Sequence, residues 1–152
     1  MLLVQSCSKS KKQAEEPVPA LELYSGYFYK IIKKARREGK IRPDLDIRIL
    51  SAKYGLLEPE TEITTYDLRM DSKRAAELSD SVPDELAAIV ETTKHNQILV
   101  NMGKEYQQAI AGFDSHIDAN VKYLSGKLGE RGSKLKQIIR TPKSENSPIN
   151  VA

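Results

Sequence analysis

The sequence predicts a single α/β domain with a mostly parallel four-stranded sheet flanked by helices. Short apolar runs of strand length alternate with segments of helical period, which is the pattern of βαβ units. The chain has 152 residues, 39% of them hydrophobic and 30% charged, and is long enough to bury the core of one domain. We expect that domain to cover residues 1–140 and a flexible C-terminal tail to follow at 141–152.

The N-terminal part of the chain predicts one strand and one helix. Leu-Leu-Val-Gln-Ser at 2–6 has the apolar character of a short buried strand. A helix is expected from 25 or 26 to 37, because apolar residues recur there at helical spacing. Ser25 is a suitable N-cap for this helix, and Gly39 is a suitable C-terminal stop.

The middle of the chain predicts a second strand followed by two helices. The strand is the apolar run 47–51, and the connection 58–70 after it is expected to be irregular. A helix capped by Asp71-Ser72, or by Ser72 alone, is expected to continue to about 78. Pro83, placed in a first helical turn, opens another helix that continues to about 92.

The C-terminal part predicts two more strands, each followed by a helix. The third strand is 97–101, and a short helix at 104–111 follows its glycine turn. The fourth strand is 121–124. The segment 126–132 is basic and punctuated by glycines, and a last helix, expected at 133–139, closes the domain.

Charge is unevenly distributed along the chain, although the formal net charge is only +3. Seven basic residues and one acid lie in 30–42, and six basic residues and one acid lie in 127–143. Such a layout steers phosphate-bearing ligands, while a solvated basic helix face explains the first run equally well. The single cysteine excludes an internal disulfide, and no metal or cofactor is expected. No apolar run approaches a membrane span, so we expect a cytoplasmic protein without membrane contact.

Three of the predicted strands are followed by loops that carry polar side chains and glycines. These residues are Cys7, Ser8, Lys9 and Lys11 after the first strand, Ser51, Lys53, Tyr54 and Gly55 after the second, and Asn101, Gly103 and Tyr106 after the third. Because parallel strands end at the same edge of a sheet, we expect these loops to converge there. Backbone amides at glycine turns and lysine side chains bind anions, so the predicted site suits a phosphate or a nucleotide.

This hypothesis assigns a role to each candidate. Phosphate contacts are expected from Lys9, Lys53 and Arg131, and base or sugar contacts from Tyr24, Tyr54 and Tyr106, with Tyr66 in the same region. The alternative is that the tyrosines pack at the sheet edge with satisfied hydroxyl groups. Cys7 is either a nucleophile or, more commonly for its position, a structural thiol. Asp67 is the best-placed acid or base, or a turn-forming aspartate.

One segment resembles a known family. The run ILSAKYGLLEPETEITTYDLRM contains Ser-x-x-Tyr-Gly-x-Leu, then Pro, then Tyr-x-Leu, and is similar to the signature of the YaaA proteins (peroxide stress response, DNA-binding) and their shorter uncharacterised relatives. The segments LLVQSCSKSK, PALELYSGYF and ILVNMGKEYQQAI extend the resemblance over 2–110, with a weaker echo at 129–135. The resemblance implies DNA binding, a part in stress response and a Rossmann-like or uracil-DNA-glycosylase-like sheet.

Three functions follow as hypotheses. The leading one is a YaaA-like domain that binds a nucleic acid or a nucleotide at the strand-exit loops. The second is an enzyme acting on a nucleoside or nucleotide N-glycosidic bond, in which Asp67 activates water or steadies positive charge on the sugar. The third is a protein-interaction domain without a small ligand.

Overall fold

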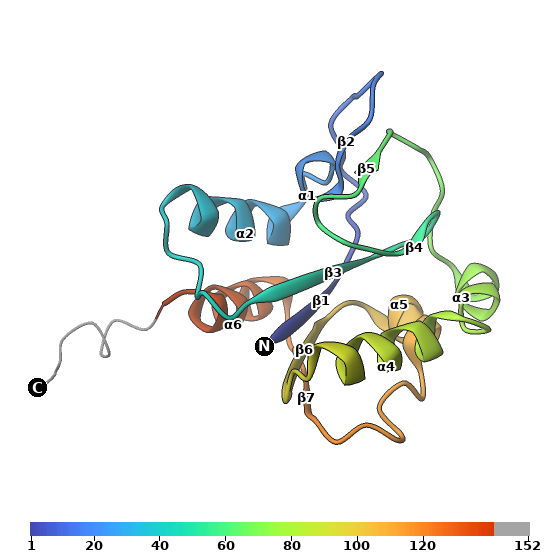
Figure 1. The fold of residues 1–152 in the computed structure, drawn as a ribbon. Helices are drawn as coiled ribbons and strands as arrows, with labels where there is room; N and C mark the ends of the chain where they lie inside the picture. The colour runs from blue at the N-terminus through green and yellow to red at the C-terminus, as the bar shows by residue number, and fades with distance from the viewer. Residues whose placement is uncertain (142–152) are drawn as a thin grey trace, which may run out of the picture.

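A five-stranded sheet lies at the centre of the computed structural model, which describes residues 1–141 (Figure 1). In spatial order its strands are β4 (Gly55–Leu57), β3 (Asp46–Ser51), β1 (Leu2–Ser6), β6 (Gln97–Asn101) and β7 (Asn120–Tyr123). β3, β1, β6 and β7 run parallel, which confirms the predicted α/β class and its mostly parallel sheet. The central strand, β1, is buried on both faces, as its apolar sequence predicted.

The predicted number of four strands was wrong, because β4 adds to the edge of the sheet antiparallel to β3. The chain reverses within 52–54, and Ser51 then pairs with Gly55. Gly55 has a φ of +76°, a conformation that glycine adopts without steric cost. The three residues of β4 are too few to show the alternation of a strand, so the sequence indicated only a loop here.

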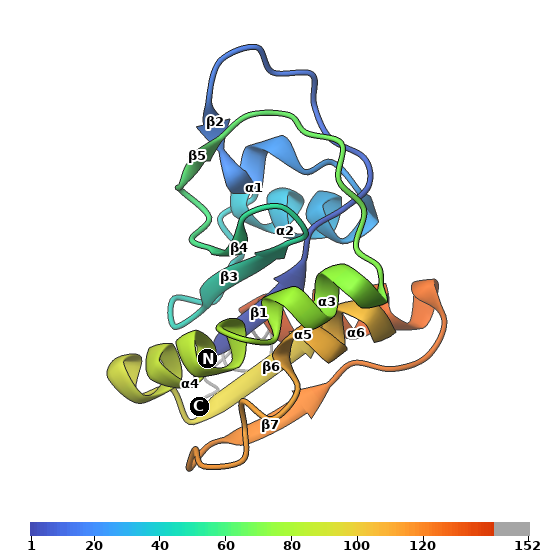
Figure 2. The same cartoon turned by 90° about the vertical axis from the view of Figure 1, so that its right-hand side faces the viewer.

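Helices cover both faces of the sheet (Figures 1 and 2). One layer contains α1 (Ala20–Leu23), α2 (Tyr27–Arg37) and α6 (Leu128–Ile139), and the other contains α3 (Ser72–Leu78), α4 (Val82–Thr93) and α5 (Lys104–Ile110). Successive strand residues point to opposite layers: Leu3 packs in the core with α2 and α6, and Val4 packs in the core with α3, α4 and α5.

Helix α6 begins at Leu128, five residues before the predicted start at 133, so the predicted start was wrong. The Glu130 carboxylate accepts a hydrogen bond of 3.1 Å from the Lys127 backbone N–H, which fixes the first turn. Position 132 inside the helix requires a glycine, because the Tyr27 ring occupies the space where an added Cβ would lie. The other predicted helices agree with α2, α3, α4 and α5 to within two residues at each end.

A small second sheet joins two segments that the sequence left irregular. β2 (Val18–Pro19) pairs antiparallel with β5 (Glu62–Ile63), and α1 begins directly after Pro19. Thr65 ties the same segments together, because its hydroxyl donates to the Lys12 carbonyl at 2.7 Å and accepts from the Ala14 N–H at 2.9 Å. Figure 2 shows these two segments side by side beyond the end of the main sheet.

The predicted tail at 141–152 lies, apart from residue 141, outside the described residues. In the part of the chain that is described, no helix has the length and apolar character needed to cross a membrane.

Candidate functional site

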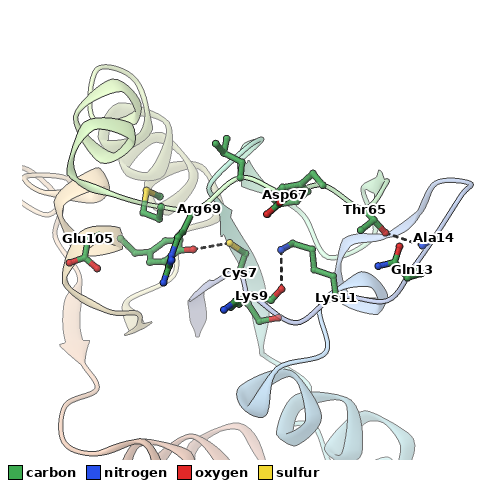
Figure 3. Close-up of a pocket in the computed structure, with 14 residues that line it drawn as sticks. Cys7, Lys9, Lys11, Gln13, Ala14, Thr65, Asp67, Arg69 and Glu105 are labelled. Carbon is green, nitrogen blue, oxygen red and sulfur yellow. Dashed lines mark hydrogen bonds between the residues drawn. The ribbon is translucent and has the colours of Figure 1, made fainter.

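A cleft of about 1010 Å³ opens at the carboxyl ends of the parallel strands (Figure 3). It is formed by the loop after β1, the connection between β5 and α3, and the first turn of α5. The neighbouring parallel strands β3, β1 and β6 end at this edge, as predicted, and the loop after β1 and the start of the helix after β6 line the cleft. Ligands of open α/β sheets bind at such edges.

Basic side chains enter the cleft from two segments. Lys9 and Lys11 belong to the loop after β1, and Arg69 belongs to the connection after β5 (Figure 3). The Lys11 ammonium donates to the Lys9 carbonyl at 3.1 Å and lies 4.6 Å from the centre of the Tyr66 ring. Among the described residues, neither Lys9 nor Arg69 forms an ion pair. Two positive charges are therefore available to a ligand.

Ser8 connects the cleft to the start of α2. Its hydroxyl donates to the Ser10 carbonyl at 2.6 Å and accepts from the Gly26 N–H at 3.1 Å. The backbone of Gly26 comes so close that an added Cβ would lie 2.6 Å from the Ser8 Cβ. Gly26 is thus required because its backbone lies against the Ser8 side chain, a contact that fixes the β1 exit loop against α2.

Gly26→Ala is expected to lower the free energy of unfolding by about 1–3 kcal/mol, because the new methyl group must push the Ser8 loop away. Gly103→Ala is the matched control, since Gly103 is also an extended N-cap glycine but has no atom within 4 Å of its added Cβ. Urea unfolding of both variants measures the difference. Equal losses would show that the contact at Ser8 carries no strain.

A chain of hydroxyl groups lies behind the cleft wall. The Ser51 Oγ accepts the Lys53 N–H at 3.1 Å and the Tyr54 N–H at 3.0 Å. Both lone pairs of Ser51 are then occupied, so its own proton is donated to the Tyr66 Oη at 3.0 Å. The Tyr66 Oη also hydrogen-bonds the Tyr24 Oη at 2.6 Å. This chain holds the Tyr66 ring in place at the cleft wall.

Burial keeps the tyrosines of the site protonated. It raises the pKa of Tyr24 to about 12, against the opposing effect of its hydrogen bonds. It also raises the pKa of Tyr66 and of Tyr106, and the neighbouring Cys7 adds to both shifts. These phenols therefore remain neutral at physiological pH and serve as hydrogen-bond donors and stacking surfaces, not as general bases.

Cys7 lines the cleft and is partly buried. Its Sγ lies 3.1 Å from the Tyr106 Oη (Figure 3). His95 lies elsewhere and contacts Asp46. Among the described residues, the Cys7 thiol therefore contacts no base that could take its proton. Nucleophilic catalysis by Cys7 stays a hypothesis.

Some of the candidates predicted from the sequence line the cleft, some lie behind or beside it, and two lie away from its lining. Cys7, Ser8, Lys9, Tyr66, Asp67 and Tyr106 line the cleft. Tyr24 and Ser51 are buried behind it, and Lys53, Tyr54 and Gly55 form the adjoining hairpin turn. Gly103 caps α5, and Arg131 contacts Asn101 away from the cleft lining.

Several cleft residues were missed by sequence reasoning. They are Gln13, Thr65, Arg69 and Glu105. Thr65 and Arg69 flank Tyr66 and Asp67 in the segment that carries the family resemblance, and Glu105 precedes Tyr106, so proximity to those residues was the available signal.

Fold and site together define an α/β domain with an open, partly cationic cleft at the carboxyl ends of its parallel strands. The chain belongs to DUF6884, a family of unknown function, whose family model matches residues 1–137. The crystal structure of AF0587, a protein of unknown function, is similar with a TM-score of 0.56 and 15% sequence identity. The similarity covers 93% of this chain and 44% of that one, so this chain spans less than half of that protein. Comparison with curated proteins gave no significant match.

Proposed function

We propose that this protein binds a nucleotide or a nucleic acid in the cleft at the carboxyl end of β1. The observation that carries the proposal is that two basic side chains, Lys9 and Arg69, line the same cleft as two tyrosines. Within residues 1–141 neither basic side chain has an acidic partner. Basic groups bind phosphate, and neutral tyrosines stack on bases or donate hydrogen bonds to sugars.

The size and shape of the cleft support this ligand class. Small-molecule sites usually measure roughly 300–1,000 Å³, and the cleft of about 1010 Å³ lies at the upper end of that range. One nucleotide fits such a space, and an open cleft also accepts part of a longer strand. The acids Asp67 and Glu105 also line it, which favours a ligand with donor groups in addition to phosphate.

The relation to the YaaA proteins is part of the same proposal. Its support is that the serine and both tyrosines of the resembling segment form one cluster: Ser51 hydrogen-bonds Tyr66, and the Tyr54 and Tyr66 rings meet edge to face at 5.5 Å. In this proposal the domain is a Rossmann-like or uracil-DNA-glycosylase-like variant of the α/β fold, and its DNA binding takes place at the cleft.

Arg69→Gln is expected to weaken binding about tenfold, because one charge-assisted phosphate contact is lost. The measurement is fluorescence anisotropy with labelled single-stranded DNA, duplex DNA, RNA and a panel of nucleotides, at two salt concentrations. Binding of the preferred ligand should weaken with salt, as counterion release requires.

Arg37→Gln is the matched control, since it removes the same charge from the exposed side of α2, outside the cleft. Equal losses in both variants would move the binding surface to α2 and contradict the proposal. Absence of binding to every ligand would leave the protein-interaction hypothesis in its place.

Asp67 favours a second candidate, hydrolysis of an N-glycosidic bond. Its carboxylate is exposed and lies in the same cleft as the basic side chains (Figure 3). A carboxylate at that position can activate water or stabilise positive charge that develops on a sugar. Release of a free base from any member of the nucleotide panel would establish this activity.

A further inference from the structure

Three polar side chains are fully buried at one end of the sheet. Among residues 1–141, the buried polar side chains are Gln5, Ser51 and Asn101, each at most 1% exposed. They lie at the carboxyl ends of β1, β3 and β6. Each of them stands two positions after an apolar residue of its strand: Leu3, Ile49 or Leu99. Because alternate residues of a strand point to the same face, all three point to the face covered by α2 and α6. Burying polar groups costs free energy unless they are hydrogen-bonded, so each of these three side chains is expected to have a partner.

Gln5 and Asn101 together hold Arg131. The Asn101 Nδ2 donates to the Gln5 Oε1 at 2.9 Å, which turns the Asn101 Oδ1 toward α6. That oxygen accepts from the Arg131 Nε at 3.0 Å and from the Arg131 Nη2 at 2.8 Å. The guanidinium also lies 4.9 Å from the centre of the Phe28 ring. The side chain is thus fixed on two sides.

Arg131 differs from the other partly buried arginines in the charge of its partner. Arg48 pairs with the Asp46 carboxylate at 2.6 Å, and Arg140 pairs with the Glu38 carboxylate at 2.8 Å. Within the described chain, Arg131 has a neutral amide in place of a carboxylate. Burial accordingly lowers its pKa. A partly desolvated positive charge is left without compensation, a state that a bound anion relieves.

The geometry also defines which atoms remain for a ligand. Asn101 occupies the Nε/Nη2 edge of the guanidinium and leaves the Nη1/Nη2 edge without a partner among the described residues. That second edge has the fork geometry that binds two oxygens of one phosphate group. Asn101 is paired in register with Gln5, two residues before the cleft residue Cys7, so by strand geometry the Cα atom of Asn101 lies within about 10 Å of the Cα atom of Cys7.

We infer that Arg131 forms a phosphate-binding subsite whose guanidinium is positioned by the buried Gln5–Asn101 pair. The inference rests on the proposed function and deepens it, because it separates the ligand into a phosphate group held by Arg131 and a body held in the cleft. Gln5 and Asn101 are positioning residues and do not touch the ligand.

Asn101→Asp tests the inference, because it places a carboxylate against Arg131 with almost no change in shape. We expect the affinity for phosphate to fall at least about tenfold, since the new charge competes for the cation and repels the anion. Thermal unfolding checks that the variant stays folded, because the Gln5 amide must turn over to donate a hydrogen bond to the new carboxylate. Arg131→Gln should abolish phosphate binding, and Lys136→Gln, an exposed charge removal in the same helix, should not affect it.

The full chain is titrated with inorganic phosphate, adenosine monophosphate and an oligonucleotide without terminal phosphates, and binding is followed by NMR at the Arg131 side-chain Nε–H. Phosphate that perturbs this signal in the wild type but not in Asn101→Asp supports the subsite. Tighter binding of adenosine monophosphate indicates that the subsite takes a terminal phosphate, and tighter binding of the oligonucleotide indicates that it takes a bridging phosphate.

The inference is overturned if Asn101→Asp binds as the wild type does, or if no phosphate compound perturbs the signal. Nucleotide binding that depends on Arg69 but not on Arg131 overturns the inference and leaves the proposed function standing. If inorganic phosphate binds at Arg131 but no nucleotide binds, the proposed function is overturned and the phosphate subsite stands.

Discussion

Ser51→Ala is expected to lower the free energy of unfolding by about 2–4 kcal/mol, because its hydroxyl group serves three partners at a fully buried position. Without it, the backbone N–H groups of Lys53 and Tyr54 lose their acceptor. The Tyr66 hydroxyl loses its donor at the same time. Unpaired polar groups away from water are costly, so the loss exceeds that of a single exposed hydrogen bond.

Urea unfolding at neutral pH measures this loss. Ser79→Ala is the matched control, because the Ser79 hydroxyl is exposed and bonds one carbonyl, that of Ala76. It should change stability by well under about 1 kcal/mol. If the two variants were equally stable, the hydroxyl chain behind the cleft would contribute nothing to the folded state.

Alkaline pH is expected to destabilise the protein steeply between about pH 10 and pH 12. Burial raises the pKa of Tyr24 from 10.0 to about 12 and raises that of Tyr29 well above 10.0. In this window the unfolded chain has released protons that the folded chain keeps, so stability present below pH 10 is lost as pH rises. Each tyrosine contributes a slope of at most about 1.4 kcal/mol per pH unit, so these two together contribute at most roughly 3 kcal/mol per pH unit.

Tyr66 and Tyr106 act in the same direction, whereas Lys33 opposes them, because burial lowers its pKa. Urea unfolding at a series of pH values, combined with the ultraviolet absorbance of tyrosinate, measures the effect. Tyr24→Phe should reduce the slope by the contribution of one group. A stability that is flat up to pH 12 would contradict the burial of these phenols.

Local patterns in the sequence were sufficient to predict most of the secondary structure. The strands at 2–6 and 97–101 agree with β1 and β6 at both ends, because a short apolar run between polar loops is a local signal. Strand β4 and the first turn of α6 were missed. In both places a glycine is typical of a turn, and only the neighbouring structure shows its role: Gly55 pairs in β4, and Gly132 packs against Tyr27 inside α6.

The candidate site was predicted only in part, because a rule about the order of the elements identifies some of its residues and not others. Cys7, Lys9 and Tyr106 were identified because exit loops of parallel strands share an edge, a rule that needs only the order of the elements. Arg69 was missed, because nothing in the sequence of the 58–70 connection shows which of its side chains turns toward β1. The strand-exit rule also placed Lys53 and Tyr54 in the site, yet the turn into β4 carries them beside the cleft.

The sequence by itself determined the α/β class, the parallel core strands and the edge at which the exit loops meet. Periodicity, capping residues and turn residues act over a few positions, and they can therefore be recognised in the sequence. Tertiary structure alone decided that Ser51 supports Tyr66, and that Asn101 supports Arg131. These contacts join residues 15 and 30 positions apart. Their energy comes from pairing polar groups inside a core that exists only after the sheet and helices have assembled.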